Sequence, residues 1–90
     1  MSANSNYAEA YNSLGIALGG QGNIDKAIKQ FILAIKANPD LAEAHANLGL
    51  ALARQGKTDE GIRELRQALQ INPGFTPARK VLDSLLEQHR

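Results

Sequence analysis

Residues 51–58 carry an arrangement that is typical of nucleotide chemistry. The segment ALARQGKT has a small residue, four spacers and then Gly56, Lys57 and Thr58, the loose form of a phosphate-binding loop. Such a loop wraps an anion in backbone N–H groups, between a strand and a helix. The segment 17–24 aligns with it but reads ALGGQGNI, without the lysine, and nothing strand-like flanks either segment. We therefore predict that Gly56 ends a helix, that Thr58 caps the next one, and that no nucleotide binds.

Other residues that support catalysis or metal binding are too sparse to form a site. His45 and His89 lie 44 positions apart, and neither has a second ligand at metal spacing. The neighbouring carboxylates Asp59 and Glu60 begin an expected helix, where negative charge favours the helix dipole. We predict a packing role for His45, no catalytic activity, and no cofactor or metal.

Length, charge and cysteine content narrow the class of protein. Ninety residues are enough for one domain. The formal net charge is +1, so neither nucleic acid nor a membrane surface is expected as a partner. The absence of cysteine excludes disulfides and thiolate metal sites. Without a signal peptide or an apolar run of about 20 residues, we expect a soluble cytoplasmic protein, or a piece of a longer one.

An internal repeat dominates the sequence. Residues 7–40 aligned without gaps on residues 41–74 give 14 identities in 34 positions, including Ala-Glu-Ala, Leu-Gly-x-Ala-Leu, Gln-Gly and Asn-Pro. A period of this length indicates a solenoid, in which each unit packs mainly on its neighbours. We divide the chain into a disordered segment 1–6, two repeats at 7–40 and 41–74, and a capping segment 75–90.

Apolar spacing predicts two helices in each repeat and one in the capping segment. In the first helix, Ala10, Leu14 and Ala17 recur at helical spacing and are expected to face the core. Gly22 and Asn38-Pro39 supply the stops. The predicted helices lie at about 8–20, 24–37, 42–54, 58–71 and 76–88.

Small and large residues recur at fixed places in these helices. Gly15 and Gly49 leave room for close packing of each pair, with Ala27 and Gly61 facing them; glycine at 61 is the costlier choice inside a helix. The full pattern is Tyr11, Leu14-Gly15, Leu18, Ala27, Phe31, Ala34 and Pro39, then His45, Leu48-Gly49, Leu52, Gly61, Leu65, Ala68 and Pro73. Because residues 7–90 carry this pattern, they resemble the tetratricopeptide repeat family. The resemblance implies an all-α, right-handed α-α superhelix of two helix-turn-helix repeats plus a C-terminal capping helix.

The resemblance also implies a function and a site. Proteins similar to this family bind a peptide or helix of a partner protein in a concave groove lined by the first helices. Ile16 and Leu50 are branched apolar residues at equivalent places on that face. The predicted groove residues are Glu9, Asn12, Ile16, Glu43, Ala46, Asn47, Leu50, Arg54 and Lys80. Some family members hold a C-terminal carboxylate in a clamp of asparagines, lysines and an arginine. Only Asn47 fits that clamp, so this ligand is not expected.

Helix 24–37 supports a different function. Ile32 and Leu33 extend its apolar surface where the second repeat has Arg66 and Gln67. A helix that is apolar on every side is usually buried on every side. The alternative prediction is a structural segment of a larger protein that forms a homo-oligomer through Ile32 and Leu33.

Overall fold

The computed structural model describes residues 3–88, and the side chains of residues 7–88, as an all-helical chain. The helices are α1 (Ala3–Gly20), α2 (Ile24–Ala37), α3 (Ala42–Arg54), α4 (Thr58–Ile71) and α5 (Thr76–Gln88). No strand occurs in this part of the chain. None of these helices is both long enough and apolar enough to cross a membrane.

Four helices begin and end at the predicted residues, and the first differs. α1 begins at Ala3 rather than at residue 8. Residues 3–6, which were expected to be disordered, form its first turn. Met1 and Ser2, the rest of that segment, lie outside the described residues.

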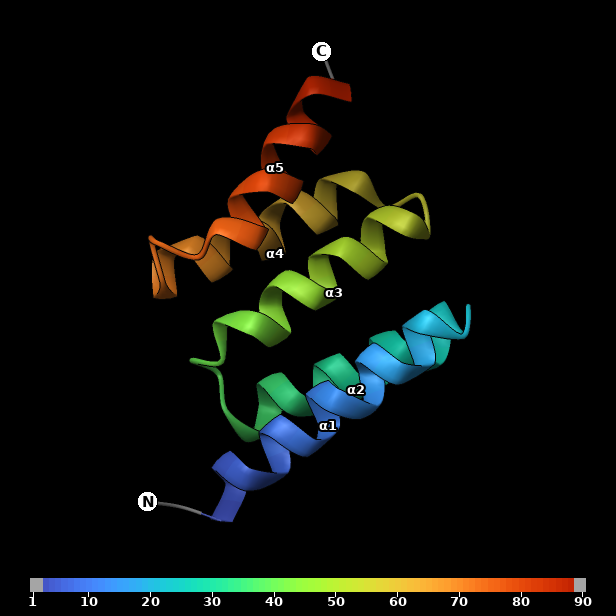
Figure 1. The fold of residues 1–90 in the computed structure, drawn as a ribbon, viewed down its shortest axis with the longest axis vertical. Helices are drawn as coiled ribbons and strands as arrows, with labels where there is room; N and C mark the ends of the chain where they lie inside the picture. The colour runs from blue at the N-terminus through green and yellow to red at the C-terminus, as the bar shows by residue number, and fades with distance from the viewer. Residues whose placement is uncertain (1–2, 89–90) are drawn as a thin grey trace.

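The helices form a row of packed pairs (Figure 1). α1 packs along α2, and α3 packs along α4, while α2 also contacts α3 and α4 contacts α5. The first helices α1, α3 and α5 lie in front of α2 and α4 in Figure 1, and they touch one another in succession. The result is an elongated slab of 42 × 28 × 17 Å, which is the solenoid that the sequence repeat predicts.

The segment that resembles a phosphate loop closes the end of α3. Gly56 has a φ of 93°, a left-handed conformation that favours glycine. Its N–H donates to the Ala53 carbonyl at 3.0 Å, and the N–H of Lys57 donates to the Leu52 carbonyl at 2.9 Å. This hydrogen-bonded turn is a common helix ending. The N–H groups of Gly56 and Lys57 are therefore already paired within the helix end.

The start of α4 differs from the prediction in one detail. Lys57 is the N-cap residue, and no side chain caps the helix there. Thr58 is already the first residue of α4, so it does not form the predicted cap. Asp59 and Glu60 lie in the first turn as expected, where their charge favours the helix dipole.

Two clusters of buried residues hold the repeats together. One joins the two repeats and consists of Ala27, Phe31, Leu48, Ala51 and Leu52. The other joins the second repeat to the capping helix α5 and consists of Ala46, Ile62, Leu65, Ala68, Ala78, Leu82 and Leu85. Each cluster takes residues from at least two units, so the stack depends on contacts between neighbours.

The buried face of α1 is not the predicted one. Ala10, Leu14 and Ala17 are exposed, and Leu14 has 48% of its surface accessible. The equivalent residues of α3 are buried because α1 and α2 lie against that helix; they are Ala44, Leu48 and Ala51. No described helix covers the same stripe of α1. From residue 7 onward, the buried residues of α1 are Ala8, Asn12 and Gly15 instead.

His45 has the predicted packing role. It is buried at the start of α3, with Nε2 2.8 Å from the Pro39 carbonyl oxygen and Nδ1 2.9 Å from the Glu64 carboxylate. It therefore ties α3 to α4 and to the loop after α2. His89, the other histidine, lies outside the described residues.

Candidate functional site

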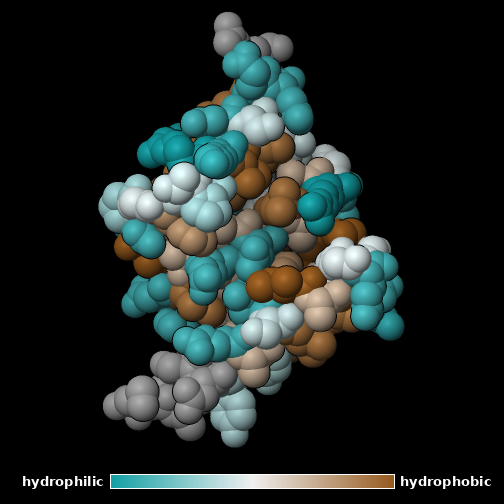
Figure 2. All heavy atoms as spheres, in the orientation of Figure 1, coloured by the Kyte–Doolittle hydropathy of each residue, from teal (hydrophilic) through white to brown (hydrophobic). Residues whose placement is uncertain are grey.

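Two hollows open beside α3. The first lies between α1, α2 and α3 and has a volume of about 230 Å³. The second, which is more open, lies between α3 and α5 and has a volume of about 410 Å³. Leu50 and Arg54 line both, so the C-terminal half of α3 forms a ridge between them. Figure 2 shows the side on which α1, α3 and α5 lie in front, where hydrophobic surface emerges among hydrophilic groups.

The first hollow has mainly apolar walls. Ile16 and Leu50 stand on its two sides, from α1 and α3, and Phe31 of α2 contributes from the core. Gly19 and Gly20 border it at the end of α1 without adding side chains. Such a space accommodates an apolar side chain better than a charged one, because burial of a charge without a partner is costly.

The second hollow is more mixed. Val81 and Leu85 supply apolar surface from α5, and Leu50 supplies it from α3. Arg54 and Lys80 add two positive charges. Among the described residues, no acidic side chain lines either hollow. The pair of hollows therefore combines apolar surface with cations.

A buried hydrogen bond supports the first hollow. The Nδ2 of Asn47 donates to the Oδ1 of Asn12 at 3.0 Å, and joins α3 to α1. Asn12 has only 6% of its surface accessible, and Asn47 is half-buried. A satisfied hydrogen bond of this kind fixes the separation of the two helices, because breaking it leaves a buried polar group unpaired.

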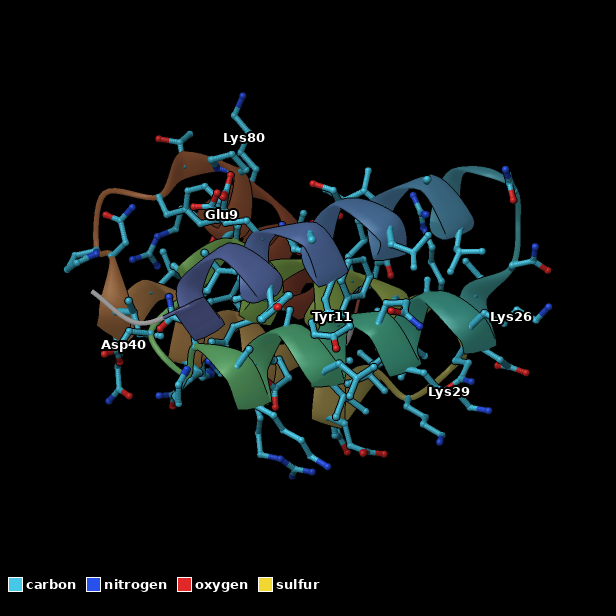
Figure 3. All side chains as sticks on the ribbon, turned by 90° about the horizontal axis from the view of Figure 1, so that it is seen from below. Glu9, Tyr11, Lys26, Lys29, Asp40 and Lys80 are labelled. Atoms are coloured by element: carbon cyan, nitrogen blue, oxygen red, sulfur yellow. The ribbon has the colours of Figure 1, made fainter. Side chains whose placement is uncertain are left out.

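Five of the nine predicted groove residues line the two hollows. Four of them line the first hollow: Ile16, Asn47, Leu50 and Arg54. Lys80 lines the second. Glu9 and Glu43 are exposed but line neither. Figure 3 shows Glu9 and Lys80 projecting from the side of the first helices, whereas Lys26 and Lys29 project from α2 on the other side.

Ala46 and Asn12 are placed differently from the prediction. Ala46 is buried in the cluster that joins the second repeat to α5, and Asn12 is buried against α3. They occupy equivalent positions in the two repeats, where one first helix touches the next. This position faces a neighbouring helix, so neither side chain lies on the open surface.

The sequence reasoning missed several residues of the hollows. Ile24 and Phe31 belong to the apolar stripe of α2, and they also reach the first hollow. Val81 and Leu85 reach the second hollow from α5. Helical spacing gives no sign that these residues border open space. Gly19 and Gly20 continue the stripe of Glu9, Asn12 and Ile16 on the predicted concave face, and they border the first hollow.

Ile32 and Leu33 lie away from both hollows. They are exposed on α2, with 40% and 38% of their surfaces accessible. Tyr7 and Leu14 of α1 are also exposed large apolar side chains. Exposed apolar surface therefore lies on the first helix pair as well as around the ridge of α3.

Comparisons with known proteins agree with this architecture. The profile of a protein family described as tetratricopeptide repeat matches residues 12–74. A crystal structure of MamA is similar to this chain, with a TM-score of 0.86 and 32% sequence identity. The match covers 91% of this chain and 48% of that chain, so this chain spans about half the length of MamA. No curated protein sequence matches this chain.

Proposed function

Because the chain belongs to the tetratricopeptide repeat family, we propose that it binds a peptide or helix of a partner protein in the groove formed by α1, α3 and α5. Repeats of this family generally mediate protein–protein interaction. The observation that carries the finer proposal is the pair of hollows that share Leu50 and Arg54. A ligand that crosses the ridge of α3 meets apolar surface on both sides of it.

The chemistry of the groove favours a polypeptide ligand. Short peptides and helices are recognised by a few apolar side chains that enter pockets, with polar groups around them. A few well-buried side chains usually supply most of the binding energy. Leu50 is half-buried between the hollows, so a ligand side chain packed on it loses water on both surfaces.

We also propose that the chain has no catalytic activity of its own. Members of this family are typically scaffolds. The segment 51–58 supports the proposal, because the N–H groups of Gly56 and Lys57 already donate to carbonyls of α3. These two N–H groups could wrap a phosphate only if these hydrogen bonds were broken.

Replacement of Leu50 by glutamate tests the proposed groove. A library of random 12-residue peptides is selected against the wild-type protein, and the affinity of the selected peptides is measured by fluorescence polarisation. We expect Leu50→Glu to weaken binding roughly 10- to 100-fold, because it removes apolar contact and places a negative charge between the hollows.

Leu86→Glu is the matched control. Leu86 is a leucine on α5, is partly exposed, and lines neither hollow. We expect its variant to bind as the wild type does. The groove is not the binding site if Leu50→Glu folds and still binds every selected peptide like the wild type. A selection that yields no peptide also contradicts the proposal.

A second candidate function is self-association or docking to a further repeat through the first helix pair. The stripe Ala10, Leu14 and Ala17 is exposed, although the equivalent stripe of α3 is buried against the preceding helix pair. Leu33 and Ile32 add exposed apolar surface on α2. Exposed apolar patches are typical of interaction sites.

Light scattering at increasing protein concentration tests this candidate. We expect the mass of the wild-type protein to rise with concentration, and we expect Leu14→Lys and Leu33→Lys to keep it at that of a monomer. Neither substitution removes a buried side chain, so stability should change by less than about 1 kcal/mol. A wild-type protein that stays monomeric throughout contradicts self-association.

A further inference from the structure

Gly19 and Gly20 have no role that the fold requires. Neither has a positive φ, unlike Gly22 and Gly56. A Cβ added at Gly19 would lie 3.8 Å from the Cβ of Ala27, an ordinary contact, and one added at Gly20 would meet nothing within 4 Å. The backbone would accept other residues at both positions.

The second repeat shows that the helix end does not need these glycines. The equivalent residues are Ala53 and Arg54. The turns that follow are the same, because the N–H of Gly22 donates to Gly19 at 3.0 Å as that of Gly56 donates to Ala53 at 3.0 Å. Glycine is the poorest helix former after proline, so two glycines at the end of α1 weaken the helix with no gain in folding.

The absence of side chains at Gly19 and Gly20 leaves open space beside the end of α1. Both glycines border the first hollow, and Arg54, which takes the place of Gly20 in the second repeat, reaches the same hollow from α3. An apolar cavity of about 150 Å³ can hold a benzene ring. The first hollow, at about 230 Å³, is therefore large enough for one aromatic or branched side chain.

The charges beside the hollow favour one kind of ligand. Arg54 lines both hollows and Lys80 lines the second, and the described residues place no carboxylate in either lining. A ligand with an acidic group close to its apolar side chain would meet a cation without displacing an anion. A basic ligand would meet like charge.

We propose that Gly19 and Gly20 keep open a socket for one large apolar side chain of a partner peptide, and that a carboxylate next to that side chain contacts Arg54. The inference rests on the proposed function, because the socket is part of the same groove. It adds the chemistry of the ligand, an acidic peptide with a leucine- or phenylalanine-sized anchor. It also explains why the two repeats differ at this position.

A Gly20→Leu variant tests the socket. Leucine is a strong helix former and its Cβ meets nothing, so the thermal unfolding midpoint should not fall. Its side chain should occupy the socket and weaken binding of the selected peptides roughly tenfold or more. Ser13→Ala is the control, since Ser13 is exposed on α1, lines neither hollow, and alanine also favours the helix. We expect it to bind as the wild type does.

A double-mutant cycle identifies the side chain that enters the socket. Each apolar residue of a selected peptide is replaced by alanine and is measured against wild type and Gly20→Leu. For the anchor residue, the effects of the two changes should not add, because either change alone abolishes the contact between the anchor and the socket. Selected peptides should also carry an acidic residue near the anchor, and Arg54→Gln should lower their affinity.

The outcomes separate this inference from the proposed groove. If Leu50→Glu abolishes binding but Gly20→Leu binds within about twofold of the wild type, the groove stands and the socket is wrong. Selected peptides without a shared apolar anchor, or with basic residues beside it, also overturn the socket. If neither variant affects binding, both proposals are wrong.

Discussion

Leu65→Ala is expected to lower the free energy of unfolding by about 3–4 kcal/mol. Leu65 is fully buried in α4, in the cluster that joins the second repeat to α5. The substitution removes apolar contacts and leaves a cavity that neighbours on separate helices cannot readily fill. For a domain of this size, with a total stability of roughly 5–13 kcal/mol, the loss is large. Urea unfolding followed by circular dichroism measures it.

Leu33→Ala provides the matched comparison. It deletes the same atoms from α2, but Leu33 has 38% of its surface accessible. We expect a loss of less than about 1 kcal/mol, because solvent already covers part of the side chain. If both substitutions lower the free energy of unfolding equally, the cluster around Leu65 does not hold the second repeat and α5 together.

The helices could be predicted from the sequence because local signals repeat. Gly22 and Gly56 end the first helices with the same turn, and Asn-Pro ends the second helices. The apolar spacing between these stops predicted the remaining residues of each helix. The start of α1 lacked such a signal, and the helix extends to Ala3. Helix ends are therefore predictable where glycine, which accepts a positive φ, or proline, which cannot continue a helix, marks them.

The faces of the helices were less predictable because they depend on neighbours. Leu14 and Leu48 occupy equivalent positions, yet Leu14 is exposed and Leu48 is buried. Leu48 is buried because the helix pair α1 and α2 packs on α3. The apolar spacing within a single helix does not predict such a neighbour. Ala46 was assigned to the groove and lies in the core for the same reason, since α5 covers it. Leu50 was assigned to the groove because it lies opposite the core stripe of its helix, and it lines both hollows.

Gly49→Ala is expected to destabilise the protein by about 2–3 kcal/mol. An added Cβ would lie 2.7 Å from the carbonyl oxygen of Gly61 and 2.9 Å from Cγ of Leu65. The first atom belongs to the backbone of α4 and the second to a fully buried side chain, so neither can move aside cheaply. The helices would have to separate, and the strain exceeds the gain in helix propensity. Chemical denaturation measures the difference.

Gly61 of α4 faces Gly49 of α3 at this close contact between the two helices. An added Cβ there would lie 2.6 Å from the carbonyl oxygen of Gly49, so glycine at this position is a requirement of packing and not merely a costly choice. Gly20→Ala is the control, since its Cβ meets nothing within 4 Å, and we expect it to stabilise the protein by up to about 1 kcal/mol. The same substitution should therefore have opposite signs at Gly49 and Gly20. If Gly49→Ala is as stable as the wild type, α3 and α4 do not approach as closely as the structure shows, and close backbone contact is not what selects glycine there.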